Sequence, residues 1–199
     1  MANAEKRLVN LYLESNPNPN SLKFVANFML VPDGQHFDFP DAAAATAAPL
    51  ALELFSQFDF VERVFFMNNF VTVTKNEATD WADVQGELKQ AIISFLEDNN
   101  GFVVTQAQAE AHANEGENDS ELIQKIKTIL EEYIKPAVEQ DGGAISFHSY
   151  HQEDKRVKLL LQGECSGCPS STITLKAGIE NLLKRMLPQE VELVEAEGV

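Results

Sequence analysis

Residues 99–117 divide the sequence into two differently patterned halves, which limits the chain to two small folding units rather than one large core. The stretch opens with Asn99 to Gly101, and its later part, Gln106 to Glu117, is rich in Ala, Gln and Glu and contains no large apolar side chain. We interpret it as a flexible linker, part of which could extend the preceding helix. The expected fold class is α+β, with two small α/β two-layer domains at residues 1–98 and 118–199.

Composition excludes several classes of partner. The chain has 199 residues, of which 44% are hydrophobic, enough to form two cores. Its formal charge of −16 argues against nucleic acid and anionic membranes as partners, because both are polyanions. No apolar run is long enough to span a membrane, and Met1 to Arg7 lacks the apolar core of a secretory signal.

The first half is predicted to mix strands and helices. Alternating apolar residues predict strands at Leu8–Glu14, Leu22–Leu30, Val61–Phe66 and Phe70–Thr74. The last two strands are expected to form a hairpin, because Asn68 and Asn69 between them tolerate positive φ. One helix is expected to run from Pro49 to about Gln57, and another to follow Asp80 as its N-cap. No cysteine lies in this half, and none of its residue patterns is typical of catalysis.

The second half opens with a strongly periodic helix, Leu122 to Ile134, for which Asn118 and Glu121 could form a capping box. Pro136 is expected to kink or restart this helix. A hairpin, a second amphipathic helix and a short strand are predicted next, at Ala144–Tyr150, Arg156–Gln162, Pro169–Pro188 and Val191–Val194. Apolar residues mark the second helix at Ile173, Leu175, Ile179, Leu182, Leu183 and Met186.

The only two cysteines, Cys165 and Cys168, lie on one turn just before the second helix. Unpaired N–H groups and the positive end of the dipole at a helix N-terminus favour thiolate over thiol. Two thiolates cannot complete the four-thiolate shell that zinc or an iron–sulfur cluster usually takes. A close pair in a long chain fits a reducing compartment, so we expect a cytoplasmic protein.

Three interpretations of the pair remain open on spacing alone. The cysteines could have no metal role, they could form a dithiol–disulfide oxidoreductase, or two copies of the chain could share a metal or cluster. Thioredoxin-like enzymes place such a pair after a strand of a βαβ unit, whereas here a predicted hairpin precedes it. Spacing does not separate zinc from iron–sulfur.

Five segments carry a family resemblance. Asp141–Gly143, Gly163–Thr172 and Leu175–Glu180 closely resemble the NifU C-terminal-like (Nfu) iron–sulfur domain. Asn16–Phe24 and Val71–Lys75 are similar to the Nfu N-terminal domain. Together the resemblance covers nearly the whole chain.

The resemblance implies a scaffold or carrier rather than an enzyme. Such a protein binds a cluster, commonly [4Fe-4S] with [2Fe-2S] as the other type, between the two subunits of a homodimer. By this resemblance Cys165 and Cys168 are the cluster ligands. The expected partners are apo iron–sulfur client proteins and upstream cluster-assembly proteins, with the first domain selecting clients or modulating transfer.

Three other residues of the second half could contribute to a metal site or a contact. His148 and His151 could assist metal binding, but histidines on a hairpin are more often simply solvated. Gly178 costs about 1 kcal/mol in a helix interior relative to Ala, which indicates a close backbone approach. The approaching group is either a second subunit or the domain's own sheet.

Overall fold

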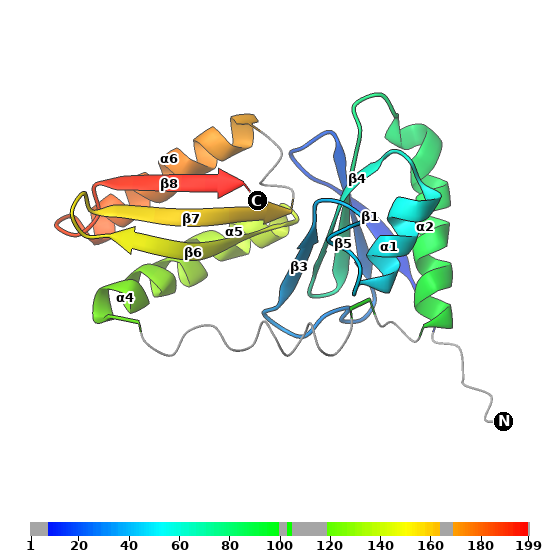
Figure 1. The fold of residues 1–199 in the computed structure, drawn as a ribbon, viewed down its shortest axis with the longest axis horizontal. Helices are drawn as coiled ribbons and strands as arrows, with labels where there is room; N and C mark the ends of the chain where they lie inside the picture. Colours follow the sequence, from blue (N-terminus) through cyan, green and yellow to red (C-terminus); the bar gives the residue numbers. More distant parts are fainter. Residues whose placement is uncertain (1–7, 100–102, 105–118, 164–168, 199) are drawn as a thin grey trace. The chain divides into compact units, whose positions relative to one another are not determined.

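The computed structural model describes residues 8–99, 103–104, 119–163 and 169–198 (Figure 1). The chain divides into two compact units, 1–115 and 116–199. Each unit combines helices with its own sheet and its own hydrophobic core, which confirms the α+β class. Most of the predicted linker, residues 100–102 and 105–117, lies outside the described residues.

The first unit contains a five-stranded antiparallel sheet in the order β1-β2-β5-β4-β3. Its strands are β1 Leu11–Ser15, β2 Ser21–Ala26, β3 His36–Phe39, β4 Val61–Met67 and β5 Phe70–Lys75. The tight turn between β4 and β5 is made by Asn68, whose φ of 47° is left-handed, and Asn69. This is the hairpin that the sequence predicts.

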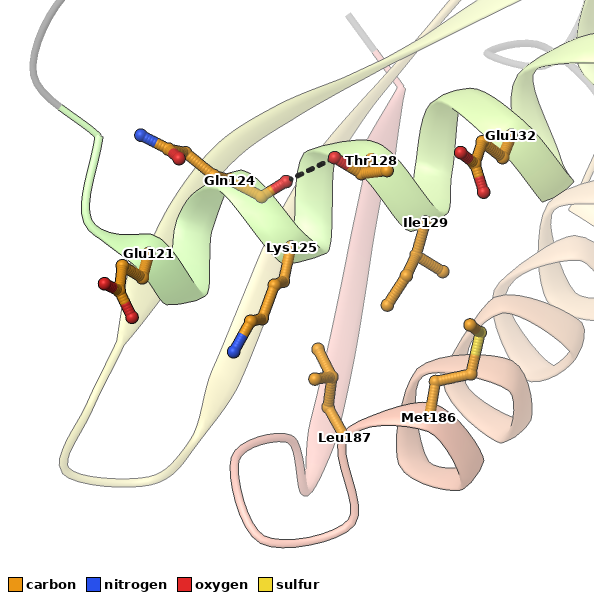
Figure 2. A pocket seen from close by; sticks show the side chains of 8 residues that line it. All are labelled: Glu121, Gln124, Lys125, Thr128, Ile129, Glu132, Met186 and Leu187. Carbon is orange, nitrogen blue, oxygen red and sulfur yellow. Dashed lines mark hydrogen bonds between the residues drawn. The ribbon is translucent and has the colours of Figure 1, made fainter.

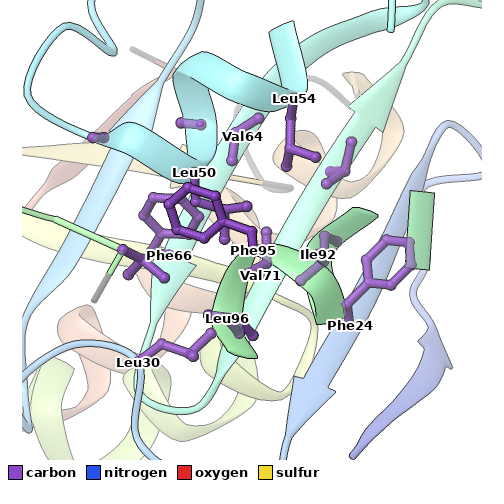
Figure 3. Close-up of a cluster of buried hydrophobic side chains, with 14 of the residues drawn as sticks. Phe24, Leu30, Leu50, Leu54, Val64, Phe66, Val71, Ile92, Phe95 and Leu96 are labelled. Atoms are coloured by element: carbon purple, nitrogen blue, oxygen red, sulfur yellow. The ribbon is translucent and has the colours of Figure 1, made fainter. Parts of the chain in front are cut away.

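Helices α1 Pro49–Gln57 and α2 Trp81–Asp98 supply the other layer of the first unit. Pro49 suits the first turn of α1 because its missing N–H would have no partner there. Asp80 caps α2, since its Oδ1 accepts a hydrogen bond from Ala82 N–H at 2.9 Å. Both helix starts are as predicted. The helices and strands enclose a core of fully buried side chains that includes Phe24, Leu54, Phe66 and Ile92 (Figure 3).

Strand β3 is absent from the sequence prediction. It has only four residues, between Gly34 and Pro40, and forms one edge of the sheet by pairing with β4. A strand this short is defined by its neighbour rather than by its own pattern. The predicted strand Leu22–Leu30 also ends early, at Ala26, because Leu30 N–H donates instead to the Asn68 carbonyl, 2.7 Å away.

The second unit is built on a three-stranded sheet in the order β6-β7-β8. Strands β6 Gly143–His151 and β7 Arg156–Gly163 are antiparallel, whereas β8 Leu193–Gly198 is parallel to β7. Its helical segments are α4 Glu121–Ile129, a π-helical turn Leu130–Ile134, α5 Lys135–Gln140 and α6 Pro169–Met186. Helices and sheet share a core whose fully buried members include Ile126, Leu159, Leu161, Ile179 and Leu183.

The first helix differs from expectation in its N-cap and agrees with it at Pro136. The N-cap is Ser120, whose Oγ accepts from Ile123 N–H at 3.4 Å, while Asn118 lies outside the described residues. The break before Pro136 takes the form of the π-helical turn. Pro136 has no N–H and its ring crowds the carbonyl four residues earlier, so the backbone widens there rather than continuing as α-helix. Among the helices of the described ranges, none has both the length and the hydropathy that crossing a membrane requires.

Candidate functional site

The predicted ligands Cys165 and Cys168 fall in residues 164–168, outside the described part of the chain. Both flanks of this loop are described. Strand β7 ends at Gly163, whose φ of 63° lies in the left-handed region, and α6 begins at Pro169. The cysteines therefore connect the end of a strand directly to the N-terminus of an 18-residue helix.

A second motif lies beside this loop. Gly143, at the start of β6, is the register partner of Gly163 at the end of β7. Gly142 precedes it with a φ of 90°, after Asp141 N–H has closed the end of α5 on the Ala137 carbonyl at 3.1 Å. The double glycine and Gly163, after which the cysteine loop begins, thus meet at one end of the sheet although they are about twenty residues apart in sequence.

The topology around the loop corrects one argument made from the sequence. Strand β7 is the second strand of a hairpin, as predicted, but it is also parallel to β8 and is joined to it through α6. The cysteine pair therefore does lie in a βαβ unit, between its first strand and its helix. The presence of a hairpin consequently does not weigh against a redox function.

The two histidines of β6 lie away from the loop. His148 is five residues and His151 eight residues beyond Gly143, which places them roughly 17 Å and 26 Å along the strand at 3.3 Å per residue. Both side chains are exposed, and His151 Nε2 lies 3.4 Å from Ser149 Oγ. Within the described residues, no group of three or more His, Cys, Asp or Glu could hold a metal.

Ion pairs and hydrogen bonds connect α6, β7 and β8, the elements on either side of the cysteine loop. Glu180 of α6 accepts from Lys184 Nζ at 2.6 Å and from Val194 N–H of β8 at 3.2 Å. The hydrogen bond from Lys184 is the main reason that the pKa of Glu180 is lowered from its usual 4.5. On β8, the hydrogen bond from Lys158 likewise lowers the pKa of Glu197. These carboxylates stay ionised at neutral pH and tie α6, β7 and β8 together.

Helix α6 buries fewer of its apolar residues than its sequence suggests. Ile179 and Leu183 are fully buried, but Ile173 is 70% exposed and Met186 is 40% exposed. Ile173 stands six residues before Ile179, a spacing that turns it well away from the buried side of the helix. This spacing could have shown from the sequence that Ile173 is exposed, but the sequence interpretation grouped it with the other apolar residues of the helix.

The second unit also has a pocket of about 500 Å³ between α4 and the C-terminal end of α6 (Figure 2). It is lined by Glu121, Gln124, Lys125, Thr128, Ile129, Glu132, Met186 and Leu187. Met186 ends α6, so the pocket lies roughly 27 Å along the helix from the cysteine loop, at 1.5 Å per residue. It is separate from the cysteine site.

Comparison with known proteins assigns both halves of the chain. The family described as "Scaffold protein Nfu/NifU N terminal" matches residues 11–99, and the family described as "NifU-like domain" matches residues 126–195. NifU-like protein 4, mitochondrial, from Arabidopsis thaliana is 41% identical over 97% of this chain and 68% of its own length. The chain belongs to the Nfu/NifU family. The second match spans Cys165 and Cys168.

Another relative shows how far the Nfu/NifU likeness extends. The protein named NFU1 iron-sulfur cluster scaffold homolog, mitochondrial, from Drosophila willistoni is 40% identical over 96% of this chain and 64% of its own length. The chain thus spans about two thirds of the length of these relatives. A solution structure of a NifU-like protein from Saccharomyces cerevisiae covers 53% of this chain and 92% of its own at 22% identity, with a TM-score of 0.46.

The names of these Nfu/NifU relatives correct the expected location. The two proteins above and NifU-like protein 5 from Arabidopsis thaliana are all named as mitochondrial. The prediction of a cytoplasmic protein is therefore wrong. Its basis was a pair of cysteines suited to a reducing compartment, and the cytosol is only one such compartment.

Proposed function

We propose that the chain is an iron–sulfur cluster carrier that holds its cargo through Cys165 and Cys168 of two copies and passes it to apo-proteins. The observation that carries this proposal is the match of both chain halves to Nfu/NifU families, the second of them across the cysteine pair. The Drosophila relative's name as an iron-sulfur cluster scaffold supports the same cargo. We propose [4Fe-4S] as the cluster type.

The donor set fits this cargo. Iron in such clusters is held by cysteine thiolates, commonly four, and each copy of the chain supplies two. The loop precedes a long helix, whose first N–H groups can donate to ligand or cluster sulfur. No further His, Cys, Asp or Glu cluster among the described residues competes for the metal.

Delivery is proposed to proceed by ligand exchange. A client thiol loses its proton and bonds to iron, one Fe–S bond to Cys165 or Cys168 breaks, and the released thiolate takes up a proton. Repeating the exchange moves the cluster without net oxidation or reduction. A site with two ligands per chain favours such exchange, because each copy holds only half of the shell.

A dithiol–disulfide oxidoreductase is the second candidate. It is favoured by one observation, that the cysteine pair lies between the strand and the helix of a βαβ unit, as in thioredoxin-like enzymes. The two functions differ in stoichiometry. A carrier loses iron and sulfide as the client gains them, whereas an oxidoreductase moves two electrons per turnover and needs no iron.

The test follows iron and sulfide during transfer. We expect protein reconstituted under anaerobic conditions to restore activity to an apo-[4Fe-4S] enzyme while losing equal amounts of iron and sulfide. Metal-free protein should reduce disulfides only slowly. The controls are Cys165→Ser and Cys168→Ser, which should not load. Rapid disulfide turnover by metal-free protein, with no transfer from loaded protein, would contradict the carrier function and support the oxidoreductase function.

A further inference from the structure

Between Ile173 and Asn181, one side of α6 carries no charged side chain and faces away from the core of its own unit. Arg185, four residues beyond Asn181, continues this side at the C-terminal end of the helix. We call this side the open face of α6. Its residues are all exposed: Ile173, Thr174, Ala177, Gly178 and Asn181. Their spacing places them together on the side opposite the fully buried Ile179 and Leu183, given 3.6 residues per turn.

Ile173 makes this face unusual for a surface. Its 70% exposure is among the highest of the large apolar side chains in the described residues. The uncharged face contrasts with the neighbouring side of the same helix, which carries Lys176, Glu180 and Lys184. An exposed isoleucine on an uncharged side of a helix is typical of a surface that another protein covers.

The surroundings of Gly178 also favour a contact with another protein on this face. A methyl group added at Gly178 would meet nothing within 4 Å in this structure, so packing against its own sheet does not explain a glycine here. The open space leaves room for the other explanation given by the sequence, approach by a second subunit. Gly86 of α2 is also in open space and provides a matched comparison in the other unit.

Charge and ligand count identify the other molecule as a second copy. Two chains of charge −16 repel each other, and a two-fold contact brings identical patches together, so an uncharged patch is the surface able to approach itself. Ile173 lies four residues after Pro169, where the cysteine loop ends and α6 begins, which is about 6 Å along the helix axis at 1.5 Å per residue. A second copy close enough to share the thiolates would therefore also cover Ile173.

We infer that the open face of α6 is the contact surface for the second copy in the cluster-loaded dimer. In that contact Ile173 excludes water beside the cluster, and Gly178 allows the two helices to approach closely. This inference rests on the proposed function, because the shared cluster is what brings the two copies together.

The first test replaces the glycine. In the apo-protein Gly178→Leu should raise the thermal midpoint of unfolding, because the site is open and leucine is the better helix former. In loaded protein the same change should weaken the dimer about tenfold or more, measured by sedimentation. Gly86→Leu should also raise the apo midpoint but leave the loaded dimer unchanged. A general effect on folding cannot both raise the apo midpoint of Gly178→Leu and weaken its loaded dimer.

The second test replaces the isoleucine. Ile173→Ser should accelerate cluster loss to an iron chelator about tenfold, because water gains access and apolar burial is lost. The matched control is Leu193→Ser, since Leu193 is 40% exposed and pairs with Arg156 at the far end of the sheet. The control should release the cluster at the wild-type rate, and Ile173→Val should stay close to wild type.

Three results would overturn the inference. If Gly178→Leu and Ile173→Ser both keep wild-type dimers and cluster lifetimes, the second copy does not use this face. If they slow only transfer to the apo-enzyme, the face binds clients instead. If wild-type protein loads no cluster at all, the proposed function fails and this inference fails with it.

Discussion

Gly142 bears the clearest backbone constraint beside the cysteine loop. Its φ of 90° is a conformation that L side chains rarely adopt, and it sets the turn that brings Gly143 opposite Gly163. A double glycine before a strand predicts such a turn from sequence alone. The register that brings this turn to the cysteine loop comes only from the fold.

Replacing Gly142 with Ala should therefore destabilise the second unit. The left-handed conformation costs a residue with a Cβ about 1–2 kcal/mol, which should appear as a lower free energy of unfolding in urea. Gly86→Ala is the control, because a methyl group there meets nothing within 4 Å in a helix interior and should stabilise by about 1 kcal/mol. Equal effects of the two changes would show that backbone strain at Gly142 is not important.

Ile173 and Gly178 show the limit of reading single residues from a pattern. From the sequence, Ile173 was grouped with the apolar residues that mark α6, yet its side chain is 70% exposed. The sequence also left two explanations for Gly178, and only the space around it removed one of them. The exposure of a side chain depends on which side of its helix meets the sheet. Where apolar residues cover a broad part of the helix, periodicity alone does not identify that side.

At the scale of elements, α6 is fastened to β8 through one carboxylate. Glu180 joins Lys184 of its own helix to the backbone N–H of Val194, at 2.6 Å and 3.2 Å. Because α6 carries the cysteine loop at its N-terminus, this link helps to set the position of the loop on the sheet.

Glu180 should make the stability of the second unit depend on pH. Its pKa in the folded protein is lowered below 4.5, so its ionised form stabilises the fold above that pH. The contribution is lost as the pH falls through the lowered pKa. In urea, the free energy of unfolding of the wild type should clearly exceed that of Glu180→Gln at pH 7. The difference should be smaller at pH 3.5. A difference that stays constant between the two pH values would contradict this role.

Elements with a strong local signal were predictable. Helix α1 has the predicted bounds, Asp80 caps α2, and both hairpins were found, because caps, prolines and apolar periodicity act locally. Strand β3 and the parallel pairing of β8 were missed, since both depend on a neighbouring strand distant in sequence. The cysteine pair was found from its motif, but its place in a βαβ unit required the sheet order.

At the scale of the whole molecule, the chain combines two units that each have a separate core. All cysteines are in the second unit, whose helices and sheet bury their own apolar residues. We therefore propose that the second unit binds the cluster and that the first unit selects clients or modulates transfer.

A fragment of residues 116–199 tests this division. It should fold alone, because its core is complete without the first unit, and it should load a cluster with the stoichiometry of the full chain. Transfer to some apo-proteins should be slower than from the full chain. A folded fragment that does not load, checked by circular dichroism and iron content, would show that the division is wrong.

The central claim is that two copies share one cluster, and native mass spectrometry of reconstituted full-length protein tests it most directly. The measurement gives the number of chains and the cluster mass of each species together. Without added thiols, cluster mass should occur only on dimers, with one cluster for two chains, and Cys168→Ser should show none. A cluster-loaded monomer in the same sample would contradict the shared site.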